Sequence, residues 1–200
     1  MLLRVLGVQC YLGGLIVLLS MKILAIAGSL RAGSSNVAFI QAISNLAPAY
    51  VEMDIYEELG SLPLFSPDID TSPPPLQVTR LRSLIEAADA VIICTPEYAY
   101  GMPGALKNAL DWLVSSAQLY KKPTAALSTS PSERGGDRAL VWLRQTLNAL
   151  DANVSKSNSF SVPYIRAALK KEGIQDALLI KQIEDLFTEL SSSLTKSSVV

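Results

Sequence analysis

Short apolar runs alternate with longer amphipathic segments from Met21 onward, and this alternation constrains the fold more than any other feature of the sequence. It is typical of a parallel sheet whose strands are joined by crossover helices. Two of the runs, 90–95 and 124–128, are almost continuously apolar, as expected of strands buried on both faces. The five predicted strands are Lys22–Ala27, Val51–Tyr56, Ala90–Thr95, Thr124–Ser128 and Val154–Phe160.

The segments between these runs carry apolar residues at three- and four-residue spacing, which predicts helices with one buried face. In one segment Leu140, Leu143 and Leu147 recur on the same side, whereas Arg144 is left for solvent. The predicted helices cover residues 36–46, 76–88, 104–114, 137–150 and 175–190. Five βα units of this kind predict an α/β fold with helices on both faces of one sheet.

The pattern accounts for one domain, residues 21–190, flanked by two segments of different character. Residues 1–20 form an apolar stretch with a single early Arg4. We interpret them as an extension upstream of a mis-assigned start, with Met21 as the true first residue; the alternative is an export or anchor signal. The Ser-rich tail, residues 191–200, is expected to fray.

Charge and residue usage exclude several classes of function. The chain has 17 basic and 18 acidic side chains and no basic run, which argues against nucleic-acid and membrane partners and favours a small-molecule enzyme. It contains no histidine, which argues against Ser-His or Cys-His catalysis and zinc chemistry, and we predict no metal site. Cys10 and Cys94 lie far apart, as in proteins of a reducing compartment, so we expect a cytoplasmic protein.

The loop after the first predicted strand, Gly28–Asn36, has the composition of a phosphate site. Its two glycines let the backbone turn, its hydroxyls and Arg31 can bind an anion, and a helix begins at its end. The simpler alternative is that Ser34, Ser35 and Asn36 only cap that helix. The loop is neither a Gly-x-Gly-x-x-Gly nor a Walker sequence, which argues against dinucleotide binding by this element and against triphosphate hydrolysis.

Two further loops follow the third and fourth predicted strands, at the edge of the sheet where α/β proteins bind ligands. The segment 96–104 combines Pro and Gly with Tyr98 and Tyr100, and it predicts a rigid wall suited to a planar heterocycle. An ordinary connection with buried aromatic residues is the alternative. The segment 128–136 is small and polar, with Gly135 and Gly136 permitting close approach of a ligand.

With these loops in place, residues 21–190 resemble the NADPH-dependent FMN reductase family, a flavodoxin-like group that includes quinone, azo-dye and chromate reductases. The resemblance rests on Gly28-Ser-Leu-Arg31 with Ser35-Asn36, on Pro96-Glu-Tyr98 continuing through Gly101-x-Pro-Gly-Ala-Leu-Lys-Asn-Ala-Leu-Asp-Trp112, and on Gly135-Gly136. It implies a flavodoxin-like three-layer fold with strand order 2-1-3-4-5.

The resemblance also implies that FMN is the cofactor and that NADPH or NADH is the co-substrate. The phosphate would be held by Ser29, Arg31, Ser34, Ser35 and Asn36. The flavin ring would lie along Pro96, Glu97, Tyr98, Ala99 and Tyr100, largely through backbone groups. Ser128, Thr129, Ser130 and Gly135 would approach it from the other side. Many family members have Asn where this chain has Ala99, so the side-chain hydrogen bond of that Asn is not expected here, whereas backbone contacts would remain.

We therefore expect a hydride to pass from NAD(P)H through FMN to a small acceptor at the same open face, by a ping-pong mechanism and without a catalytic side chain. The acceptor would be a quinone, a free flavin, an azo compound or a metal oxyanion. A flavodoxin-type electron carrier and a non-catalytic binding module are the alternatives. The resemblance implies a homodimer or homotetramer, for which Tyr100, Trp112 and Trp142 are candidate interface residues. Lys107, Asp111, Trp112 and Cys94 are interpreted as structural residues.

Overall fold

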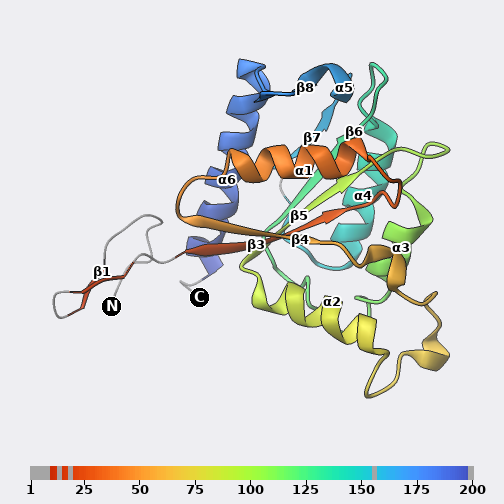
Figure 1. The fold of residues 1–200 in the computed structure, drawn as a ribbon. Coiled ribbons are helices and arrows are strands. Elements are labelled where there is room, and N and C mark those ends of the chain that lie inside the picture. The colour runs from red at the N-terminus through yellow and green to blue at the C-terminus, as the bar shows by residue number, and fades with distance from the viewer. Residues whose placement is uncertain (1–9, 13–14, 18–19, 155–156, 198–200) are drawn as a thin grey trace.

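A five-stranded parallel sheet forms the centre of the molecule (Figure 1). The structure, a computed structural model, describes residues 10–12, 15–17, 20–154 and 157–197. The strands lie in the order β4-β3-β5-β6-β7, which is 2-1-3-4-5 when this sheet is numbered along the chain, so the predicted fold is confirmed. They are β3 (Met21–Ala27), β4 (Val51–Tyr56), β5 (Ala90–Thr95), β6 (Thr124–Thr129) and β7 (Ser159–Val162).

Helices cover both faces of this sheet, as the apolar spacing predicts (Figure 1). One face packs against α1 (Ser35–Asn45), α5 (Ile165–Ala168) and α6 (Ala177–Ser197). The other face packs against α2 (Leu76–Ala87), α3 (Gly104–Asp111) and α4 (Asp137–Ala149).

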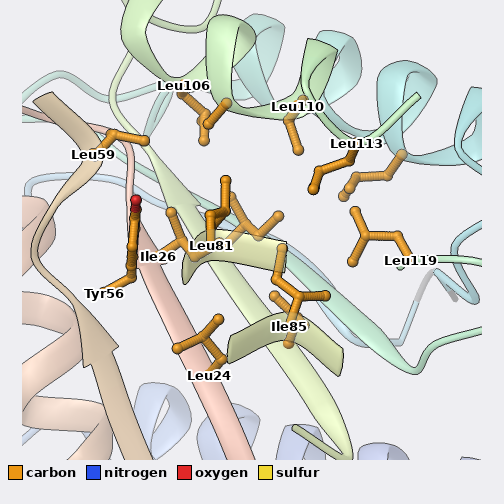
Figure 2. Close-up of a cluster of buried hydrophobic side chains, with 14 of the residues drawn as sticks. Leu24, Ile26, Tyr56, Leu59, Leu81, Ile85, Leu106, Leu110, Leu113 and Leu119 are labelled. Atoms are coloured by element: carbon orange, nitrogen blue, oxygen red, sulfur yellow. The ribbon is translucent and has the colours of Figure 1, made fainter. Parts of the chain in front are cut away.

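The central strand β5 explains why its sequence is continuously apolar. Val91 and Ile93 belong to the core under α2, α3 and α4, whereas Ile92 and Cys94 belong to the core under α1 and α6. Alternate side chains of a strand point to opposite faces, so a strand covered on both sides needs apolar residues at every position. Figure 2 shows the first of these cores, where side chains of β3, α2 and α3 meet.

Among the element bounds that differ from the prediction are those of the fifth strand and of the third helix. The predicted strand 154–160 is displaced: β7 begins at Ser159 and pairs with β6 from Ala126, since 155–158 reads Ser-Lys-Ser-Asn and supplies no apolar pair for the core. Helix α3 ends at Asp111, three residues before the predicted end, and Trp112 is its C-cap.

The Ser-rich tail is helical where the sequence predicts a frayed end. Helix α6 continues to Ser197 instead of ending at 190. Ser192 and Ser193 donate hydroxyl hydrogen bonds to the carbonyls of Thr188 and Glu189, one helical turn earlier, so these hydroxyls are satisfied within the helix. Ser191 is buried and donates to the sulfur of Met21, which fastens this part of the helix to the start of β3.

Several short elements were not predicted, because segments of two to four residues show no periodicity. They are the antiparallel pair β1 (Cys10–Leu12) and β2 (Leu15–Val17), the single turns η1 (Leu59–Ser61) and η2 (Pro67–Ile69), helix α5 and the antiparallel pair β8 (Leu169–Lys170) and β9 (Gly173–Ile174). The rest of residues 1–20 lies almost wholly outside the described residues, and the mis-assigned start stays a prediction. Within the described ranges, no helix has both the length and the apolar character needed to span a bilayer.

Candidate functional site

The carboxyl ends of β3, β5 and β6 meet at one edge of the sheet, and the three loops singled out in the sequence follow them. Ala27 pairs with Cys94, and Thr95 pairs with Ser128, so the strands end level with one another. The backbone N–H of Gly28 donates to the carbonyl of Cys94 at 2.8 Å. The hydroxyls of Ser29 and Tyr98 lie 3.5 Å apart. The structure thus brings the predicted site residues of separate loops together.

The first loop leads into α1 through a helix cap. Ser34 is the N-cap residue, and its hydroxyl accepts a hydrogen bond from the backbone N–H of Asn36 at 3.2 Å. The hydroxyl of Ser29 accepts from the N–H of Arg31 at 3.3 Å, and Gly33 takes a φ of +66° that favours glycine. Ser34 therefore caps α1. The N-terminus of α1, which carries the positive end of the helix dipole, still faces the loop.

Arg31 supplies the cation of this loop. Its side chain is exposed, and among the described residues its Nη2 donates only to the neighbouring carbonyl of Gly33, at 3.2 Å. None of the ion pairs found among the described residues involves Arg31. Together with Ser29 and Leu30 it lines a pocket of about 710 Å³ that extends toward β4. An unpaired guanidinium beside a helix N-terminus is suited to a phosphate group.

Asn36 is the most deeply buried polar residue of the first loop. It is 2% exposed and its amide reaches the ends of two strands. Oriented to satisfy its neighbours, Nδ2 donates to the carbonyls of Cys94 at 3.3 Å and Thr95 at 3.2 Å, while Oδ1 accepts from the hydroxyl of Thr129 at 2.9 Å. The first loop is in this way joined to the ends of the two strands that lead into the other loops.

The second loop contains a tight turn at its tip. Tyr98 and Gly101 exchange two backbone hydrogen bonds, at 2.9 and 3.0 Å, around Ala99 and Tyr100. Both central residues have positive φ, 50° and 63°, a turn that normally selects Asn and Gly. Each such residue costs about 1 kcal/mol or more, and strain of this kind concentrates at functional sites. Tyr98 and Tyr100 are 51% and 64% exposed, so their rings lie at the surface.

Glu97 in the same loop has a role that its motif does not indicate. Its Oε2 accepts hydrogen bonds from the backbone N–H groups of Arg138 and Ala139, both at 3.1 Å. These are first-turn residues of α4, whose N-cap Gly136 carries no side chain to satisfy them. Glu97 therefore caps α4 from another loop, and its carboxylate is engaged with the N-terminus of that helix.

The third loop packs tightly against β7. Ser128 is fully buried, and its hydroxyl lies 2.9 Å from the carbonyl of Gly135 and 2.8 Å from the hydroxyl of Ser161. Gly135 has a φ of +62°, and a Cβ there would lie 2.8 Å from backbone atoms of Val162 and Pro163. Thr129 is also buried, whereas Ser130 is half-buried and its hydroxyl lies 3.0 Å from that of Ser132.

A pocket of about 610 Å³ adjoins the turn of the second loop. The guanidinium carbon of Arg138 lies 4.1 Å from the centre of the Tyr100 ring, a cation–π contact. Trp142 and Val141 are about 60% exposed on α4 beside it. The pocket is lined by Ala99, Tyr100, Met102, Lys107, Arg138 and Trp142, among others. Aromatic walls and a cation suit a planar ligand with negative charge.

The residues interpreted as structural have that role in the structure. Lys107 and Asp111 form an ion pair one turn apart on α3. Cys94 is fully buried, and burial raises the pKa of its thiol, so it does not supply a thiolate. The prediction of Trp112 as an interface residue is wrong, because its side chain is completely buried. Its indole Nε1–H donates to the carbonyl of Pro63 at 2.8 Å, and its ring packs edge-on against Phe65.

The arrangement fits the expected flavin mononucleotide. One end offers helix N–H groups, hydroxyls and an unpaired Arg31 for a phosphate; the other offers a rigid turn and a close-packed glycine loop for a planar ring. The site contains no histidine, and the described residues contain no cluster of acidic or sulfur side chains that could hold a metal.

Comparison with known proteins gives concordant matches. The model of the NADPH-dependent FMN reductase family matches residues 21–167. An NAD(P)H-dependent FMN reductase of Pseudomonas aeruginosa is 40% identical over 134 residues, covering 66% of this chain and 72% of that protein. A quinone reductase of Escherichia coli is 36% identical over 143 residues, covering 70% of this chain and 76% of that protein. The solved structure of the flavoenzyme FerB of Paracoccus denitrificans, an NAD(P)H:(acceptor) oxidoreductase, has a TM-score of 0.77 and 27% identity, and the match covers 88% of this chain and 98% of that one.

Proposed function

Because the chain belongs to the NADPH-dependent FMN reductase family, we propose that its three loops hold FMN and that it reduces a small quinone-type acceptor with NAD(P)H. Membership of this family makes the chain an FMN-containing, NAD(P)H-dependent oxidoreductase, and not an electron carrier or a non-catalytic module. The observation that carries the site proposal is the convergence of the loops, joined by the Gly28–Cys94 and Ser29–Tyr98 contacts.

The phosphate end of FMN would lie against the first loop. Ser29, Arg31, Ser34 and Ser35 would bind it through hydroxyls, the guanidinium and the backbone N–H groups at the start of α1. Ser34 can serve by its backbone while its hydroxyl caps the helix. Asn36 would contribute its position and backbone, since its amide is committed to the strand ends.

The ring end would lie between the second and third loops. Pro96 to Tyr100 would form one wall, with Glu97 fixing that wall to α4 and backbone groups making the polar contacts. Gly135 and Ser130 would approach from the other side, while the buried hydroxyls of Ser128 and Thr129 support the loop from beneath. FMN held between these loops would supply the two-electron chemistry of hydride transfer between NAD(P)H and the acceptor.

The protein itself would bind the two substrates, orient them and exclude water from the site. The pocket beside Tyr100 and Trp142 would receive the nicotinamide and the acceptor in turn, with Arg138 near any negative charge on either. Sharing one site predicts ping-pong kinetics. In a steady-state study with NADPH and a quinone, we expect parallel reciprocal plots; intersecting plots would show that the two substrates occupy separate sites.

The absorption spectrum of the purified protein tests the proposal directly. We expect the two visible bands of an oxidised flavin, bleached by NADPH and restored by quinone. A protein that stays colourless after incubation with FMN would overturn the function. The same experiment with NADH in place of NADPH measures the preference between the two nucleotides.

A homodimer or homotetramer remains our expectation for the assembly. Tyr100, Val141 and Trp142 present exposed apolar surface around the substrate pocket, and a second copy seated there would close its open side. Sedimentation of the wild type and of a Trp142→Asp variant would test this: we expect the variant to dissociate. The cytoplasm remains the expected compartment, in keeping with the free, buried thiol of Cys94.

A further inference from the structure

Asn36 occupies the junction between the two ends of the proposed FMN site. It is the second residue of α1, and its backbone N–H belongs to the phosphate loop through the Ser34 cap. Its side chain, by contrast, contacts the strands that lead to the ring-binding loops. We propose that Asn36 is a positioning residue, whose amide sets the phosphate loop at the correct distance from the ring wall without touching the phosphate.

The amide makes its contacts in a closed environment. The side chain is 2% exposed. In the amide orientation that satisfies its neighbours, it pairs with the carbonyls of Cys94 and Thr95 on β5 and with the hydroxyl of Thr129 on β6, and the sulfur of Cys94 lies 3.4 Å from the amide. A buried amide without partners is costly, and a fully paired one holds its neighbours rigidly. One side chain therefore ties α1 to two strands.

Those partners lie directly before the ring-binding loops. The carbonyl of Cys94 also accepts from the N–H of Gly28, so both ends of the first loop are fastened to the same atom of β5. Thr95 is followed at once by Pro96, the first residue of the proposed wall, and Thr129 by Ser130 of the third loop. Loss of the amide would shift the first loop relative to the other two while leaving each loop's own groups in place.

The inference rests on the proposed function and has a distinctive signature. FMN must satisfy the phosphate loop and the ring wall at once, so the second contact is intramolecular and depends on their spacing. Riboflavin uses only the wall, and inorganic phosphate uses only the loop. Loss of a positioning residue should therefore weaken the binding of FMN but not that of riboflavin or inorganic phosphate. Loss of a phosphate ligand should instead weaken the binding of both FMN and inorganic phosphate.

The experiment measures the affinity of the apoprotein for FMN, riboflavin and inorganic phosphate in Asn36→Ala and Thr129→Val. We expect FMN affinity to fall about tenfold to a hundredfold in Asn36→Ala, while riboflavin and phosphate change less than about twofold. Thr129→Val, which removes one of the three bonds, should show a smaller loss of the same kind. The double variant should lose no more than Asn36→Ala alone, because both changes break one network.

Two controls make the comparison specific. Asn45→Ala changes an exposed asparagine near the other end of the same helix and should leave all three affinities unchanged. Arg31→Ala should weaken FMN and phosphate together and spare riboflavin. Urea unfolding of each apoprotein verifies that it is folded. Should Asn36→Ala fail to fold, Thr129→Val carries the test, because it is the milder change.

Three results would overturn the positioning role. Parallel loss of FMN and phosphate in Asn36→Ala would make Asn36 a phosphate ligand. Parallel loss of FMN and riboflavin would show that the ring wall itself is damaged. Unchanged FMN affinity would show that the amide has no part in binding. Failure of the proposed function is recognised separately, since the wild-type apoprotein would then bind no FMN.

Discussion

The carboxylate of Glu97 accepts a hydrogen bond from the backbone N–H of Ala139 at 3.1 Å, which links the ring-wall loop to the first turn of α4. The backbone N–H of Arg138 donates to the same carboxylate oxygen, also at 3.1 Å. Such a cap stabilises a helix by about 1 kcal/mol, and here it also fixes the loop.

Replacing Glu97 should therefore destabilise both the ring-wall loop and the first turn of α4. We expect Glu97→Ala to lower the free energy of unfolding by about 1 to 2 kcal/mol, and Glu97→Gln by less, because an amide oxygen still accepts but carries no charge. Urea unfolding of the apoproteins measures this. Glu133→Ala, an exposed residue of the third loop, is the matched control. Equal stability of the Glu97→Ala and Glu133→Ala variants would refute the capping role.

Arg31 should contribute to binding the phosphate of FMN and not to binding its ring. We expect Arg31→Ala to weaken FMN binding by about 1.5 to 3 kcal/mol, the range for a hydrogen bond to a charged group, and to leave riboflavin binding unchanged. Quenching of flavin fluorescence on titration with apoprotein gives both constants. Arg134→Ala serves as the control, because that exposed Arg lies in the third loop. If Arg31→Ala retained FMN as tightly as the wild type, the phosphate would have to lie elsewhere.

Two glycines with the same backbone conformation allow steric and conformational costs to be separated. Gly33 and Gly135 have φ of +66° and +62°, yet a Cβ at Gly33 meets nothing within 4 Å, whereas at Gly135 it would lie 2.8 Å from the backbone of Val162 and Pro163. Gly33→Ala should cost about 1 kcal/mol of stability from conformation alone. Gly135→Ala should cost distinctly more, and thermal melts of the two variants compare them. The reverse order would mean that the β7 backbone yields easily.

The buried hydroxyl of Tyr56 should make the stability of the fold depend on alkaline pH. Its hydroxyl is buried in the core of Figure 2 and has no hydrogen-bond partner among the described residues; burial, followed by the charge of Glu58, raises its pKa to about 12. Because the folded-state pKa lies above the unfolded value of 10.0, the folded protein binds this proton more tightly. The associated stability is complete below that unfolded value and is lost as the pH rises toward the folded one.

Tyr56→Phe should abolish this loss. At neutral pH we expect it to match the wild type or exceed it by about 1 kcal/mol, since it removes an unsatisfied buried hydroxyl. Its advantage should grow between about pH 10 and about pH 12, as seen in urea midpoints measured across that window. An advantage that stays constant with pH would show that the Tyr56 proton is not bound more tightly in the folded state.

The sheet was predictable because its strands are specified by local pattern. Val91 to Cys94 are apolar at every position, and that run can be read without knowing what covers it. The fifth strand was misplaced because its first half, 155–158, is polar, and its pairing is decided by the neighbouring strand β6. Likewise Ser191, which the composition assigns to a frayed tail, is buried because Met21 lies beside it.

For the candidate site, the sequence indicates which loops come together but not the contacts of their side chains. Glu97 and Asn36 were found by their place in a motif, yet the partners of both lie more than 40 residues away in sequence. One local signal was available for Glu97. Helix α4 follows Gly135-Gly136 and so begins without a capping side chain, which implies a cap from another part of the chain.

The contact between Ser191 and Met21 has a practical consequence for handling the protein. It places the start of β3 beside the last turns of α6, at the edge of the sheet opposite the three loops (Figure 1). A surface linker, affinity tag or fused redox partner joined near either of these residues would leave the substrate face free. The same proximity makes the domain suited to circular permutation, with residue 191 joined to residue 21 and new ends opened elsewhere.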